Sequence, residues 1–205
     1  MTAEWITADD ERLWSSSRPG DVWEAIAPLD SPEVRETRDS MRSLLNERPA
    51  PLDRRERPGH FTASAVVVAA ELDRVLLLHH AKLRIWVQPG GHADGNSNLM
   101  AVALREATEE TGISGLKIWP QAIDLDIHRV DPPLEDAHLH YDVRFLVLAP
   151  QSPVLNANHE STAQRWVSPD DFSSLGVDDG LRRLTRTGLA LALSHSQRSE
   201  TCQCL

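Results

Sequence analysis

The feature that most constrains this chain is the stretch from residue 90 to residue 113, which reads GGHADGNSNLMAVALREATEETGI. A Gly-Gly pair and a polar loop precede a run of good helix formers that begins near Asn98 and stops at Gly112. Asn98 is expected to cap this helix, while Leu99 and Val102 repeat at the spacing of one buried face. The sequence therefore predicts a turn, a helix start and a helix stop within one short segment.

Three acidic residues of this helix, Glu106, Glu109 and Glu110, are three and four positions apart. At that spacing their carboxylates project from one helical face, where like charges repel. A hard divalent cation takes oxygen ligands and would relieve this repulsion. Arg105 precedes Glu109 by four positions and is expected to pair with it. The alternative interpretation is a solvated acidic face without a bound ion.

Together with the preceding glycines, this run resembles the signature of the Nudix hydrolases. That signature reads Gly, five residues, Glu, seven residues, then Arg-Glu-apolar-x-Glu-Glu-x-Gly-apolar. The positions that match are Gly91, Arg105, Glu106, Ala107, Glu109, Glu110, Gly112 and Ile113. One position departs from it, because Ser97 stands where the signature has its early Glu. The resemblance covers roughly residues 60–172.

The resemblance implies an enzyme that cleaves a diphosphate bond in a nucleoside diphosphate linked to another moiety. It implies Mg²⁺ or Mn²⁺ as cofactor, with Gly91, Glu106, Glu109 and Glu110 as the metal-binding positions. Glu106 would be a ligand or part of the base, and Arg105 would orient the carboxylates.

Ser97 removes any base or extra ligand that the early Glu would provide. Asp94 is one substitute by position. In many members of the superfamily the base comes instead from a loop after the signature, and Glu160 is the best candidate for it here. The alternative for Glu160 is an ordinary exposed loop acid.

The chain contains nine histidines, several of which lie near the signature in strands or loops. His138 and His140 alternate, so both imidazoles are expected on one side of a strand. With His92 they could bind zinc or manganese, or donate hydrogen bonds to phosphate. The alternative for most of these histidines is a structural role.

Apolar runs typical of strands cover residues 63–70, 74–80, 82–88, 117–127, 141–149 and 165–167, and residues 181–195 form an amphipathic helix. This order favours an α/β fold, an α/β/α sandwich around a mixed sheet, which is also the fold that the resemblance implies. Residues 1–57 are expected to form a helical extension, with its strongest helix over 31–47 and a Pro- and Arg-rich connector over 49–58. Residues 58–205 are expected to form the main domain. Arg54, Arg55 and Arg57 of the connector are either phosphate contacts or a solvated linker.

The net charge of −10 argues against binding to a nucleic-acid backbone. No stretch approaches the ~20 apolar residues of a membrane helix, and the acidic start of the chain lacks the features of a signal peptide. Cys202 and Cys204, the only cysteines, sit at the end of the chain and provide no disulfide framework. These features favour the cytoplasm, and the resemblance is to a bacterial branch of the superfamily.

Other functions remain open at this stage. A catalytically weak domain that senses a nucleotide ligand or binds a partner is the main alternative, because Ser97 departs from the signature. An isopentenyl diphosphate isomerase shares the fold but relies on a core cysteine, which disfavours it. A homodimer is compatible with the tryptophans of the extension.

Overall fold

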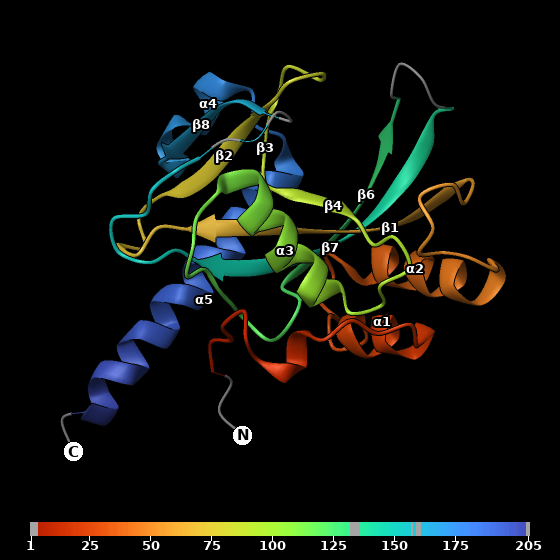
Figure 1. Cartoon of the computed structure of the whole chain (residues 1–205), viewed down its shortest axis with the longest axis horizontal. Helices are drawn as coiled ribbons and strands as arrows, with labels where there is room; N and C mark the ends of the chain where they lie inside the picture. Colours follow the sequence, from red (N-terminus) through yellow and green to blue (C-terminus); the bar gives the residue numbers. More distant parts are fainter. Residues whose placement is uncertain (1–3, 132–135, 157, 159–160, 204–205) are drawn as a thin grey trace.

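A computed structural model describes residues 4–131, 136–156, 158 and 161–203 of the chain. Strands make up one sheet and helices surround it (Figure 1). The helices are α1 (Pro19–Ile26), α2 (Arg35–Glu47), α3 (Leu99–Thr111), α4 (Phe172–Leu175) and α5 (Asp179–Gln203), with short 3₁₀ turns at Glu11–Leu13 and Pro169–Asp171. The strands are β1 (Gly59–Val68), β2 (Val75–His80), β3 (Trp86–Val87), β4 (Gly90–His92), β5 (Lys117–Ile118), β6 (Asp124–Val130), β7 (His138–Leu148) and β8 (Ser161–Val167). Within the described residues no helix is long and apolar enough to cross a bilayer.

The sheet is built around β1 and β7, which run parallel over their whole length. Their register pairs Gly59 with Leu139 and Val68 with Leu148. The other pairings are antiparallel: β1 with β2 and β4, β7 with β5 and β6, and β2 with β3 and β8. The mixed sheet that the sequence predicts is therefore confirmed.

The two faces of the sheet belong to two separate apolar clusters. Phe61 and Ala63 of β1 pack in one cluster with Leu99 and Ala107 of α3. Val66 of β1, one of the residues that point to the other face, packs with side chains of α5. Helices on both faces of a mixed sheet form the expected α/β/α sandwich, and Figure 1 shows α3 and α5 on opposite sides.

The N-terminal helices pack onto the first of these clusters. Ile6, Val22, Ile26 and Met41 are fully buried in it, alongside residues of β1 and α3. Ile6 also bridges to Ile118 of β5 through backbone hydrogen bonds of 2.9 Å in both directions. The division of the chain at residues 57 and 58 stays a prediction.

Several element boundaries differ from the sequence expectations. Helix α2 begins at Arg35 and not at Ser31, because the backbone N–H groups of Val34 and Arg35 first form a turn onto the Ser31 carbonyl. The expected strand 117–127 is split into β5 and β6 around Pro120, which has no N–H to give to a strand ladder. Of 82–88 only β3 is a strand, and the residues before it follow a turn in which Arg84 has a φ of 58°.

Candidate functional site

Helix α3 carries the acidic residues, and its ends are fixed as the sequence predicts. The Asn98 side chain accepts a hydrogen bond from the Ala101 N–H at 3.2 Å, which caps the first turn. Gly112 ends the helix in the left-handed conformation, with a φ of 68°. A Cβ at Gly112 would also lie 2.6 Å from the backbone oxygen of Asn156, so glycine is required twice over.

Two of the three glutamates are held against the Gly-Gly pair of β4. Glu110 accepts a hydrogen bond from the Gly90 N–H at 2.8 Å. The Glu106 carboxylate lies so close to Gly91 that a Cβ there would be 2.5–2.7 Å from its carboxylate atoms. Both side chains are partly buried, whereas Glu109 is exposed. The structure thus gathers Gly91, Glu106 and Glu110, while their role as metal ligands stays a prediction.

Arg105 has a different partner from the one expected. It donates to Glu106 Oε1 at 2.7 Å and to the His92 carbonyl oxygen at 3.3 Å, and not across one turn to Glu109. The reason is that Glu106 turns toward β4, where its carboxylate and the His92 carbonyl are both within reach of one guanidinium nitrogen. Arg105 therefore fixes the carboxylate that contacts Gly91.

Ser97, at the position of the early Glu, is covered by the N-terminal segment. Only 1% of its surface is exposed, and its N–H donates to the Ser16 carbonyl oxygen at 2.7 Å. Its hydroxyl has no hydrogen-bond partner within the described part of the chain.

Asp94, the expected substitute, is engaged by the connector. Arg54 donates from Nε to Asp94 Oδ1 at 2.7 Å, with a second contact from the same guanidinium to Oδ2. This hydrogen-bonded guanidinium lowers the pKa of the Asp94 carboxyl below its usual value. Arg55 pairs with Asp53 in the same way. The pairing of Arg54 with Asp94 links the connector to the loop before α3, whereas that of Arg55 lies within the connector. Contact of Arg54, Arg55 or Arg57 with phosphate stays a prediction.

Glu160, the candidate base, lies outside the described residues. Its described neighbours in the chain, Asn156 and Gln164, both bond to the C-terminal end of α3. The Asn156 N–H donates to the Thr111 carbonyl at 2.9 Å, and the Gln164 side chain donates to the Glu110 carbonyl at 2.7 Å.

A buried charged network on the face of the sheet opposite α3 had no sequence prediction. Arg144 of β7 is 4% exposed and donates to Asp142 and Asp126 at 2.9 Å, with Asp124 at 3.4 Å. Arg183 of α5 also holds Asp124, at 2.8 Å. Burial raises the pKa of Asp124, although both arginines oppose this. The alternation of Asp124 with Asp126, and of Asp142 with Arg144, was the available sequence signal.

The expected histidine group is also on this face. Strands β7 and β1 bring His138 and His140 together with His60, and the His92 ring lies 5.1 Å from the rings of both His60 and His140. His60 was not among the expected members. His128 lies beside His140 and bonds to Asp126 at 3.0 Å.

Comparisons with known proteins agree with this architecture. A family model described as the NUDIX domain matches residues 59–187. An Ap4A hydrolase structure from C. elegans is 19% identical, covers 65% of this chain and 98% of its own, and superposes with a TM-score of 0.54. A NUDIX family hydrolase from Clostridium perfringens is 23% identical, with coverages of 65% and 97% and a TM-score of 0.53. A search of curated proteins gave no significant match.

Proposed function

The chain belongs to the NUDIX family, and on this premise we propose that it hydrolyses a diphosphate bond in a nucleoside diphosphate linked to another moiety, using Mg²⁺ or Mn²⁺. The observation that carries the proposal is the contact of Glu106 and Glu110 with the backbone of Gly90 and Gly91. Two carboxylates of the signature thus contact neighbouring residues of β4, and the exposed Glu109 lies on the same helix.

These residues fit a divalent cation. Carboxylate and carbonyl oxygens are the ligands that Mg²⁺ and Mn²⁺ prefer. Space for the Glu106 carboxylate exists only because residue 91 has no Cβ. Gly91, Glu106, Glu109 and Glu110 would hold the ion, which when bound neutralises phosphate charge and lowers the pKa of a water.

The side chains around the carboxylates have distinct roles in this proposal. Arg105 orients Glu106 through the 2.7 Å hydrogen bond between them. A water molecule attacks phosphorus, the bridging P–O bond breaks, and the water's oxygen remains on one of the two phosphates. Glu160 or Glu106 takes the proton that this water loses.

The test is turnover of a panel of nucleoside diphosphate compounds with Mg²⁺ or Mn²⁺, for the wild type and Glu109→Gln. The panel includes Ap4A, the compound in the name of the C. elegans structure. Glu109 is exposed on its helix, so the substitution is expected to preserve the fold and to lower kcat/KM by at least about 100-fold, or about 2.7 kcal/mol. Glu47→Gln, an exposed glutamate on α2, is the matched control and should turn over like the wild type.

A second candidate function is a ligand-sensing domain with little catalysis. It is favoured by one observation, the burial of Ser97 beneath Ser16 where the signature has its early Glu. Tight calorimetric binding of one panel compound without metal-dependent turnover would support sensing. Turnover that is equal in the wild type and Glu109→Gln would contradict the proposed hydrolase site.

A further inference from the structure

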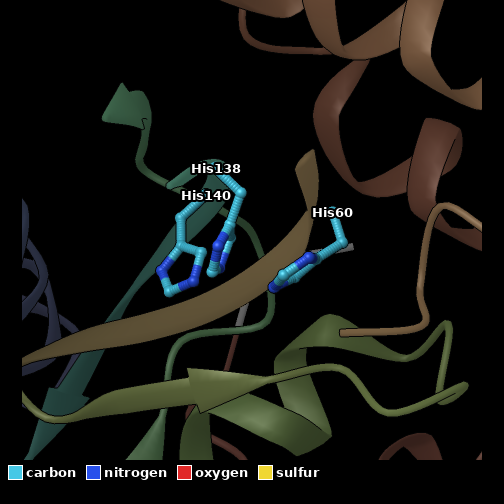
Figure 2. Close-up of side chains that lie close together, drawn as sticks. All are labelled: His60, His138 and His140. Carbon is cyan, nitrogen blue, oxygen red and sulfur yellow. The ribbon is translucent and has the colours of Figure 1, made fainter. Parts of the chain in front are cut away.

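Three histidines converge on the face of the sheet opposite α3 and its glutamates. His60 lies on β1, and His140 is its register partner on the parallel strand β7, with His138 two residues earlier on the same face. One ring nitrogen from each lies within 4.8 Å of the others, and the ring centroids are 5.0–5.2 Å apart. Figure 2 shows the His60 ring turned toward those of His138 and His140.

The hydrogen bonds at the outer side of two rings fix their tautomers. Nδ1 of His138 lies 2.7 Å from the Asp136 carbonyl oxygen, and Nδ1 of His60 lies 3.4 Å from that of Glu56. Because a carbonyl oxygen only accepts, Nδ1 carries the proton in both residues. Their Nε2 atoms therefore point lone pairs into the cluster.

Nothing in the described residues satisfies these inner nitrogens. Nε2 of His60, His138 and His140 is buried without a hydrogen-bond partner in each case. His60 is fully buried and His138 is 4% exposed. Since buried polar groups in proteins are nearly always bonded, three orphaned ring nitrogens at one point, of which those of His60 and His138 are acceptors, indicate a missing positive partner.

A proton is a poor candidate for that partner. Burial, reinforced by the neighbouring His92, lowers the pKa of His140 to about 2, and burial also lowers the pKa of His60. Burial thus favours the neutral imidazole of His60 and His140, which is the form that binds a metal ion.

We propose that His60, His138 and His140 bind one Zn²⁺ ion through Nε2, at a site separate from the carboxylates of α3. Zinc–nitrogen bonds of about 2.0–2.1 Å in a tetrahedral site place the nitrogens about 3.4 Å apart, so small ring rotations close the cluster. Imidazole ligands suit zinc, whereas Mg²⁺ requires oxygen. The carbonyl contacts at Nδ1 are the outer-shell bonds that orient metal-binding histidines.

The fourth position of the ion is left for water, as in zinc sites with three protein ligands. The structure adds His60 to the histidines that the sequence suggested, and the His92 ring lies 5.1 Å from the rings of His60 and His140. Because His60 and the other two ligands come from different strands, the ion would tie β1 to β7 at the end where β7 begins. Such an ion stabilises the folded state only, so Tm should rise with zinc.

The test uses the full chain and Zn²⁺ alone. Purified protein is stripped with a chelator, loaded with Zn²⁺, freed of excess by gel filtration and assayed for bound metal. The wild type is expected to retain one zinc per chain, and His140→Ala and His60→Ala to retain almost none. His79→Ala, on β2 and bonded to Thr162, and Glu109→Gln, in the proposed catalytic site, should both retain zinc like the wild type.

A second measurement needs no variant, so misfolding of one cannot obscure the result. X-ray absorption of the zinc-loaded wild type should show outer-shell scattering from three imidazoles. The proposal is overturned if the wild type retains no zinc, or if the ion has an all-oxygen shell. It is equally overturned if Glu109→Gln loses zinc while the two histidine variants keep it.

Discussion

At the scale of a residue, Gly91 leaves the space that the Glu106 carboxylate occupies beside β4. Alanine at this position would bring a Cβ within 2.5–2.7 Å of the carboxylate atoms. Those atoms are the far end of a flexible side chain, so the fold can accommodate the methyl group while the Glu106 carboxylate moves away. The hydrogen bond from Arg105 to Glu106 would be strained by the same movement.

We therefore predict that Gly91→Ala folds normally but loses activity. Displacing a reacting or ligating group by about 1 Å costs on the order of 100-fold in rate, and this is the expected fall in kcat/KM. The measurement is steady-state turnover together with Tm.

Gly20→Ala is the control, because a Cβ at Gly20 in α1 meets nothing within 4 Å. Its activity should equal that of the wild type. Full activity of Gly91→Ala would contradict the prediction, because it would show that turnover does not depend on the position of the Glu106 carboxylate beside β4.

At the scale of an element, β7 carries the buried cation, Arg144, that pairs with carboxylates of β7 and β6. Arg144 compensates the buried carboxylates of Asp142, Asp126 and Asp124 on its own strand and on β6. Ser64 and Thr62 of β1 also donate to Asp142, at 2.6 and 3.1 Å. The strands at the centre of the sheet are thus joined by one polar network.

Arg144→Leu is predicted to destabilise the protein by about 3–5 kcal/mol, because it leaves the buried carboxylate of Asp142 without its cation and that of Asp124 with Arg183 alone. The folded-state pKa of Asp124, already raised by burial, should rise further above its unfolded value of about 3.9. Above about pH 3.9, the folded variant still holds the proton of Asp124, whereas the unfolded chain has released it. The free energy of unfolding of the variant therefore falls as the pH rises above about 3.9. Urea unfolding at pH 5 and pH 8 should show the larger deficit at pH 8.

Arg186→Leu provides the comparison, since Arg186 forms an exposed ion pair with Glu33 at 3.4 Å. Exposed pairs contribute about 0–1 kcal/mol, so this variant should unfold almost like the wild type. Equal losses of unfolding free energy in the two variants would show that the buried ion pairs of Arg144 stabilise the protein no more than the exposed pair of Arg186.

The elements differ in how far the sequence predicts them. Helix α3 could be predicted, because its cap at Asn98, its buried face and its stop at Gly112 are all local signals. The Arg144 network could not, because its members come from β6, β7 and α5, with Arg183 far along the chain from Asp124. The place of His60 could not, because it depends on the parallel pairing of β1 with β7. That pairing joins residues 80 apart in the chain, as in the bond from Thr62 to Asp142, and no local pattern specifies it.

At the scale of the whole molecule, the N-terminal extension is joined to the site by packing and by hydrogen bonds. The Asn98 side chain donates to the carbonyl oxygens of Arg12 and Trp14, at 2.8 and 2.9 Å. Ser16 accepts from the Ser97 N–H. The cap of α3 thus holds the extension at the same time as it begins the helix.

This arrangement predicts that the extension and the sheet unfold together. Met41 of α2 is fully buried in the cluster that includes β1 and α3, so Met41→Ala should cost about 2–5 kcal/mol through lost contacts and a residual cavity. If the chain is one cooperative unit, the variant shows a single transition, shifted equally in circular dichroism and in tryptophan fluorescence. Leu83→Ala, which truncates a side chain that is 46% exposed, should leave the midpoint of the unfolding transition unchanged. Two separate transitions, of which only the first moves in Met41→Ala, would instead mean that residues 1–57 fold as a unit of their own.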